Sequence, residues 1–138
     1  MDATVARIHR RSEVGVQVFD MREIARLETD GRPYLEFLRV PDLSVGLYML
    51  PVGGEDRHSP HTEDEVYYVL AGRSRVRVGD EVGDVAAGSV VFVAAHVPHR
   101  FEDISEALSL LVVFGPAEGS RWSSATVARC EPRRPVAP

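Results

Sequence analysis

The chain has 138 residues, of which 44% are hydrophobic and 27% are charged, and its formal net charge is −5. This length fits one domain with a single core, and the composition is that of an ordinary globular protein. A net negative charge gives no electrostatic reason to expect a nucleic-acid partner, which argues against that functional class.

The sequence gives no indication of a secretory signal, a membrane span or a disulfide framework. Asp2 stands near the start with no apolar run behind it, which argues against a secretory signal. The longest apolar run, Ala107 to Phe114, is far shorter than the ~20 residues that span a bilayer. Cys130 is the only cysteine, so neither a disulfide framework nor a thiolate metal cluster is expected. We expect a cytoplasmic protein with no membrane partner, in which any metal is held by His, Asp or Glu.

The first predicted element is a short helix from Phe19 to Gly31 within an N-terminal segment of residues 1–33. Asp20 is placed to cap it, Glu23 to complete a capping box, and Phe19 and Ile24 to form a hydrophobic staple. Few apolar anchors follow, so this helix should lie outside a larger core.

From Tyr34 onward the apolar pattern has a period of two, which predicts an all-β domain over residues 34–115. Short strands at regular spacing with Gly, Pro or polar turns between them are typical of a sandwich or barrel. The expected strands are Tyr34–Val40, Leu43–Leu50, Glu65–Ala71, Arg73–Val78, Glu81–Ala86, Ser89–Ala94, His99–Asp103 and Ala107–Phe114. Residues 116–138 form a C-terminal extension, with a flexible tail from Glu131 to Pro138.

Three residues in this region form a candidate metal site. Residues an even number apart on an extended strand share one face, so His61 and Glu65 can converge on one ion. His99 stands at the start of a later strand and is a candidate third ligand. Two imidazoles and one carboxylate leave coordination positions open, as in catalytic metal sites.

The spacing around these residues resembles the motifs of the cupin superfamily. The first family motif, G-x5-H-x-H-x3-E-x6-G, is matched with every spacing kept except that serine replaces its first histidine. The second, G-x5-P-x-G-x2-H-x3-N, is matched at the glycine and the histidine. The aligned positions are Gly53, Ser59, His61, Glu65 and Gly72 for the first motif and Gly88, Ala94, His96, His99 and Asp103 for the second, of which Ser59, Ala94, His96 and Asp103 differ from the motif.

This resemblance covers about Tyr34 to Gly115. It implies a single-domain, double-stranded β-helix, which is a jelly-roll barrel with the metal inside its wider end. It also implies a homodimer. The ligand set becomes His61, Glu65 and His99, because Ser59 cannot replace an imidazole. His58 is a possible fourth ligand if Pro60 bends the chain, and His96 suits a turn because histidine tolerates a left-handed backbone.

The remaining residues are predicted to line the pocket, to lie on the surface or to have no role in the site. Ser59, Tyr48, Tyr67, Phe92 and Phe101 are candidates for lining the pocket, although aromatic residues on strands are more often plain core. Glu63 is expected to be a solvated surface carboxylate, and Arg73, Arg75 and Arg77 a solvated strand face. Arg121, Trp122 and Cys130 are assigned no role, and no residue is singled out as a catalytic acid or base.

The function expected from this site is that of a metal-dependent enzyme acting on a small organic molecule. One divalent transition metal is the expected cofactor. Fe(II) is the first choice, because two histidines and one carboxylate are the ligands of non-haem Fe(II) oxygenases, so a dioxygenase is the first expectation. Zn, Mn or Ni would instead support Lewis-acid chemistry in an isomerase, cyclase or lyase. The alternative classes are a non-catalytic cupin that binds a small ligand and a barrel with a degraded site.

Overall fold

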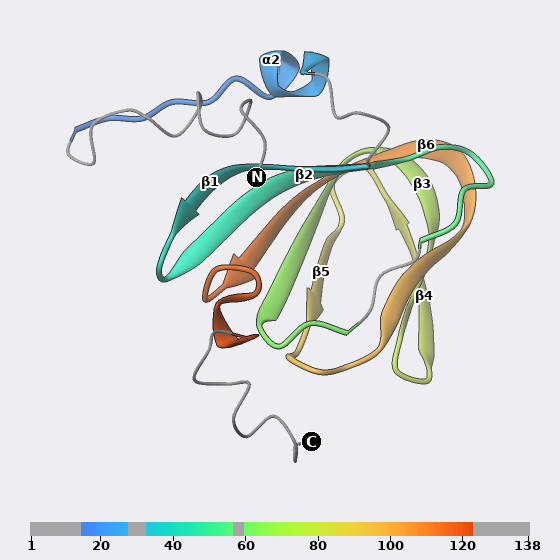
Figure 1. The fold of residues 1–138 in the computed structure, drawn as a ribbon. Helices are drawn as coiled ribbons and strands as arrows, with labels where there is room; N and C mark the ends of the chain where they lie inside the picture. Colours follow the sequence, from blue (N-terminus) through green and yellow to red (C-terminus); the bar gives the residue numbers. More distant parts are fainter. Residues whose placement is uncertain (1–14, 28–32, 57–59, 123–138) are drawn as a thin grey trace.

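The computed structural model describes residues 15–27, 33–56 and 60–122 (Figure 1). Six antiparallel strands make up most of this part of the chain, with a short helix before them and one turn of 3-10 helix after them. The elements are α2 (Met21–Arg26), β1 (Tyr34–Val40), β2 (Leu43–Leu50), β3 (Asp64–Val78), β4 (Glu81–Ala86), β5 (Val90–Val93), β6 (His99–Gly115) and η1 (Ser120–Trp122).

Strands β3 and β6 organise the sheet, because they are its two longest strands and pair with each other along almost their whole length. The strand order is β1-β2-β6-β3-β4, and β5 pairs with the first half of β3 while β4 pairs with the second half. The sheet therefore curls around one interior, as Figure 1 shows. This is the predicted all-β jelly roll.

The bend in β3 lies at Gly72, whose φ of +104° is a conformation that glycine adopts readily and other residues avoid. A Cβ atom at this position would lie 2.2 Å from the carbonyl oxygen of Ala107 on β6. The pairing register of β3 with β6 shifts on both sides of Gly72. The prediction of four separate strands here was wrong, because the irregular residues bend two continuous strands without ending them.

The core has two parts, one on each face of the sheet. The interior holds the larger cluster, to which β3 contributes Tyr67 and Val69 and β6 contributes Phe101 and Phe114. The smaller cluster lies on the outer face of β1 and β2, where α2 covers it (Figure 1). Alternate residues of β2 thus enter different clusters, with Tyr48 inside and Leu47 outside.

Helix α2 is shorter than predicted. Asp20 caps it as expected, since its side chain accepts a hydrogen bond from the backbone N–H of Arg22, and Phe19 packs with Ile24 in the outer cluster. The helix ends at Arg26, where Leu27 already has extended backbone angles. Only Ile24 is buried, so packing supports little more than one turn. Gly31, the predicted end, lies outside the described residues.

The loop after β2 is tied to β6 by Asp56. Its carboxylate accepts hydrogen bonds from the Tyr48 hydroxyl at 2.6 Å and from the Phe101 backbone N–H at 2.9 Å. The Gly53 N–H donates to the carbonyl of Ile104 at 3.0 Å. These bonds fix the loop after β2 against backbone groups of β6.

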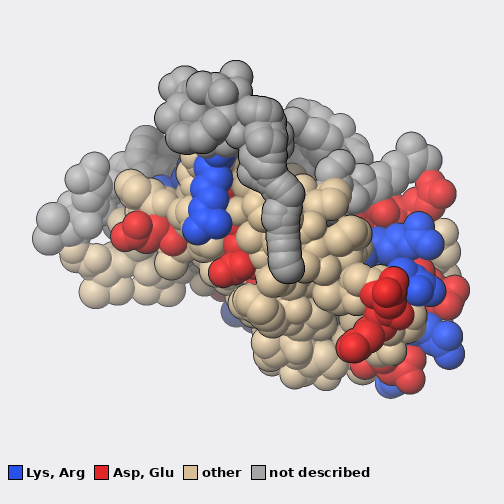
Figure 2. Space-filling model, turned by 90° about the horizontal axis from the view of Figure 1, so that it is seen from below, with Lys and Arg blue, Asp and Glu red and all other residues tan. Residues whose placement is uncertain are grey.

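The outer face around β3, β4 and β6 is charged, as predicted for the arginine row. Arg75 lies 3.4 Å from Asp84 and Arg77 lies 3.1 Å from Glu102. On this side of the molecule acidic and basic side chains are intermixed (Figure 2). Among the helices of the described residues, none is both long and apolar enough to cross a bilayer.

Candidate metal centre

His99 opens strand β6 and is held in one orientation by its own turn. Its Nδ1 lies 2.9 Å from the carbonyl oxygen of Val97. A carbonyl can only accept, so Nδ1 carries the proton and donates it, and in the neutral ring Nε2 keeps its lone pair. The ring is buried, and Nε2 points into the barrel toward Glu65 and Tyr67. The imidazole therefore presents a ligand atom to the interior.

Glu65 is the second residue of β3 and faces the same interior. Its neighbours across the sheet are Phe114 on β6 and Val93 on β5, so the carboxylate is enclosed and only 1% exposed. Its Oε1 lies 3.0 Å from Nε2 of His99. Within the described part of the chain, both carboxylate oxygens are buried, and the Tyr67 hydroxyl is placed to donate to them when that imidazole is neutral.

His61 reaches this place from the turn before β3. Its Nε2 lies 3.8 Å from Oε1 of Glu65, and its ring packs edge-on against Phe114 at a centroid distance of 4.7 Å. The N–H of His96 donates to the carbonyl of His61 at 2.7 Å, which fixes the turn from the opposite side. His96 has a φ of +70°, so its predicted turn role is confirmed.

One ligand atom from each of His61, Glu65 and His99 can be chosen so that all lie within 4.8 Å of one another. The three come from a turn and two strands that are far apart in the sequence. The even-spacing argument that linked His61 to Glu65 was incomplete, because β3 begins only at Asp64 and His61 lies before it.

The charge state of His99 depends on its neighbours. Burial lowers the pKa of His99, but the Glu65 carboxylate and the Val97 carbonyl favour the protonated ring more strongly, so the pKa lies above its ordinary value. A divalent ion bound by Nε2 of His99 and Oε1 of Glu65 would compete with a proton for the same lone pair.

These residues fit a metal ion. A buried carboxylate is costly unless a cation neutralises its charge, and two neutral imidazoles with a carboxylate are ligands that divalent transition metals accept. His61, Glu65 and His99 would hold the ion, and its remaining positions would be open.

Beside the three lies a group of carboxylates that the sequence did not reveal. Glu63, predicted as a solvated surface residue, is 1% exposed, so that prediction was wrong. Its Oε2 contacts the Thr62 hydroxyl and accepts a hydrogen bond from the backbone N–H of Arg121 at 3.2 Å. Arg121, which was assigned no role, also donates from Nη1 to the Thr62 carbonyl at 3.2 Å.

Glu118 belongs to the same group and approaches the outer side of His61. Its Oε2 lies 3.8 Å from Nδ1 of His61, while its backbone N–H donates to Ser44 Oγ and its carbonyl accepts from Arg39. Burial, followed by the charges of Glu36 and other carboxylates nearby, raises the pKa of Glu118 to about 7. No local pattern in the sequence marks Glu118, because it follows the last strand in a stretch without periodicity.

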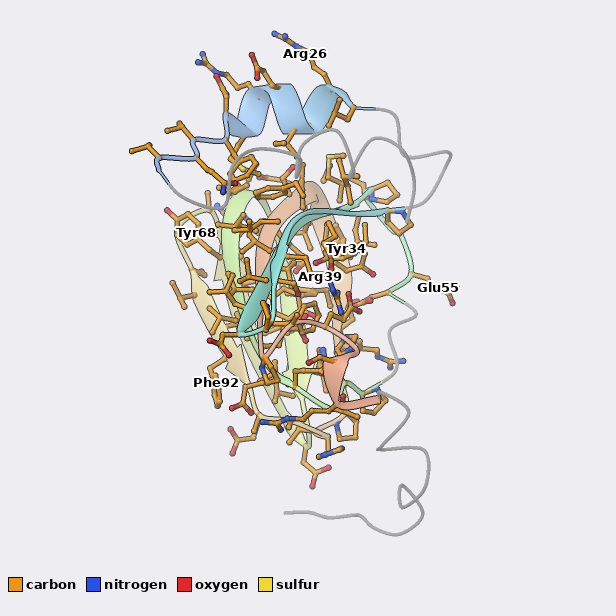
Figure 3. All side chains as sticks on the ribbon, turned by 60° about the vertical axis from the view of Figure 1, so that its left-hand side comes forward. Arg26, Tyr34, Arg39, Glu55, Tyr68 and Phe92 are labelled. Atoms are coloured by element: carbon orange, nitrogen blue, oxygen red, sulfur yellow. The ribbon has the colours of Figure 1, made fainter. Side chains whose placement is uncertain are left out.

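The predicted pocket residues divide into two groups. Tyr48, Tyr67 and Phe101 are buried in the interior cluster, where Phe101 meets Tyr67 edge-on at 4.8 Å. Phe92 is 60% exposed and, as Figure 3 shows, projects from the outside of the sheet, so it does not line the interior. The reason is strand alternation, since its neighbour Val93 takes the inward position on β5. Ser59 and the possible fourth ligand His58 lie outside the described residues.

Comparisons with known proteins agree on one family. The family model for the cupin domain matches residues 46–114. An uncharacterized protein of Streptomyces coelicolor is 52% identical over 99 residues, which cover 72% of this chain and 93% of that protein.

Solved structures agree as well. The protein TT1209 from Thermus thermophilus has a TM-score of 0.64 at 29% identity and covers 74% of this chain and 99% of its own. An RmlC-like cupin from Shewanella frigidimarina has a TM-score of 0.56 at 25% identity, with 61% and 75% of the two chains covered. The sheet topology and these matches lead to one conclusion: this chain belongs to the cupin family.

Proposed function

We propose that this chain is a metal-dependent cupin enzyme that acts on a small organic molecule. One divalent transition-metal ion is held by His61, Glu65 and His99. The observation that carries the proposal is the convergence of one ligand atom from each of the three residues within 4.8 Å, with the buried Glu65 carboxylate 3.0 Å from a histidine nitrogen whose lone pair faces it. A metal ion would neutralise this buried carboxylate and bind that lone pair.

The number of ligands supports catalysis over a purely structural role for the ion. Structural metal sites are usually closed by four protein ligands, whereas catalytic sites keep a position for substrate or water. Fe(II) is the first choice, since two histidines and one carboxylate hold iron in non-haem oxygenases, where the metal supplies oxidation by dioxygen. The protein itself positions the ligands, with Phe114 packed edge-on against His61 and Glu65 enclosed at 1% exposure.

The test of the ion-binding step is the metal content of purified protein after loading with Fe(II) without oxygen. The wild type is expected to hold one ion per chain, and His61→Ala and His99→Ala each to bind it at least about 100-fold more weakly. His96→Asn is the matched control, because it removes an exposed histidine from the same region while asparagine tolerates the left-handed backbone. A full complement of tightly bound ion in both alanine variants would contradict the assignment.

The test of catalysis follows with the loaded wild type. We expect consumption of dioxygen that depends on Fe(II) and on one member of a panel of small organic molecules, and its loss in His99→Ala. Turnover without oxygen uptake, supported also by Zn, would instead identify Lewis-acid chemistry. Tight binding of a panel member with no turnover under any metal would identify a binding protein.

A further inference from the structure

Tyr67 places a phenol oxygen beside the three predicted ligands. It stands two residues after Glu65 on β3, so both side chains face the interior. Its side chain is 0% exposed, and its ring is held edge-on against Phe101 at 4.8 Å with an interplanar angle of 89°. The hydroxyl oxygen Oη is therefore fixed and cannot turn to solvent.

Two oxygen atoms lie close to Nε2 of His99. Oη of Tyr67 lies 3.1 Å from this nitrogen, and Oε1 of Glu65 lies 3.0 Å from it. Donor atoms this close together can bind one ion in common. The phenol oxygen would therefore be within reach of an ion held by Glu65 and His99.

The hydrogen-bonding options of Tyr67 change when an ion binds. In the metal-free protein its hydroxyl lies within hydrogen-bond distance of Nε2 of His99 and is also placed to donate to the Glu65 carboxylate. Once that lone pair binds a metal, Nε2 can no longer accept this hydrogen bond. The phenol is buried, so it must then bond to the ion or to an oxygen of Glu65.

We propose that Tyr67 Oη is a fourth protein ligand of this metal centre when the ion is iron. The proposal rests on the proposed function only in requiring that His61, Glu65 and His99 bind the ion. Tyrosine is an established iron ligand in haem proteins, where its anionic oxygen favours the ferric state. On ligation the phenol proton passes to solvent. The residue also restores a set of four ligands in a chain where Ser59 replaces a family histidine.

The test is the visible spectrum of the full-length protein loaded with iron and then oxidised to Fe(III). A phenolate bound to Fe(III) gives an intense charge-transfer band that histidine and carboxylate ligands do not give. We expect the wild type to show this band, and Tyr67→Phe to lose it and to bind iron at least about tenfold more weakly. Tyr68→Phe is the matched control, because Tyr68 is the next residue of β3, faces outward and is 41% exposed (Figure 3).

Resonance Raman of the wild type, excited within the band, supplies a second measurement that needs no variant. Tyrosinate ring modes are expected there. If the wild type binds one Fe(III) per chain but has neither the band nor these modes, the Tyr67 proposal is overturned while the proposed function stands. If the band persists in Tyr67→Phe, another residue is the ligand and the proposal is again overturned. If the wild type takes up no iron, the proposed iron enzyme fails and Tyr67 ligation fails with it.

Discussion

Glu118 shows how the fold changes the chemistry of a single residue. Its side chain is 31% exposed and lies among buried carboxylates, including Glu36 and Glu63. Burial is the largest cause of the rise of its pKa to about 7, and the neighbouring charges add to it. In the unfolded chain the same group ionises near the ordinary value of 4.5. Folding therefore opposes the ionisation of Glu118.

The sign of the resulting pH dependence follows from this difference. Between about pH 4.5 and 7 the unfolded state loses the proton while the folded state keeps it, so stability falls as pH rises through this window. We expect Glu118→Gln to raise the free energy of unfolding of the metal-free protein by about 1–3 kcal/mol at pH 8, and to have little effect at pH 4. Urea unfolding of the variant and the wild type at pH 8 and at pH 4 measures this difference in the free energy of unfolding.

Glu106→Gln is the matched control for this prediction. Its carboxylate is 63% exposed beside Arg73, so the substitution should shift the free energy of unfolding little at either pH. A Glu118→Gln variant that is no more stable than the wild type at pH 8 would show that the carboxylate cluster does not oppose ionisation.

At the scale of elements, the bend of strand β3 depends on Gly72. Its positive φ is unfavourable for alanine, and an added Cβ would meet the backbone of Ala107 at 2.2 Å, which no side-chain movement can relieve. We expect Gly72→Ala to lower the free energy of unfolding by about 2–4 kcal/mol. Thermal or urea unfolding of the variant provides the measurement.

Gly83→Ala is the matched control for Gly72→Ala. Gly83 lies on β4 with an ordinary φ, and nothing lies within 4 Å of its would-be Cβ. Its substitution should change stability by less than about 1 kcal/mol. If the two substitutions changed the free energy of unfolding equally, the bend of β3 would not require glycine at position 72.

The elements also show what local patterns can predict. The limits of β1, β2 and β4 were predicted correctly, because alternation and turn residues bound each of them. The same reasoning divided β3 and β6, since a glycine or a polar residue looks identical whether a strand ends or merely bends. Burial on both faces of β2 could not be read from alternation either, because it depends on α2 packing from outside.

At the scale of the whole molecule, ion binding should stabilise the fold, because the ligands come together only in the folded state. Saturation at about 1,000 times the dissociation constant adds about 4 kcal/mol, which corresponds to a rise in Tm on the order of 10 °C. We expect this rise for the wild type on adding Fe(II) without oxygen, and its reversal by a chelator. Differential scanning calorimetry measures it.

His99→Ala distinguishes a specific site from general binding. The variant should show little of the rise in Tm, because removal of Nε2 takes away the atom that both Glu65 and Tyr67 approach. A rise as large as that of the wild type would place the stabilising ion elsewhere. The homodimer implied by the family stays a prediction, which sedimentation of the same samples can test.

By itself the sequence determined the limits of β1, β2 and β4 and, through motif spacing, the resemblance to the cupin family, and it led to the prediction of three ligands. These follow from residue spacing, which is a local property. Only the tertiary structure decided which charges are buried, that Phe92 faces outward and that Tyr67 Oη approaches His99. The physical reason is that the bent pairing of β3 with β6 brings the interior side chains of both strands together, and residues far apart in sequence carry no local signal of that contact.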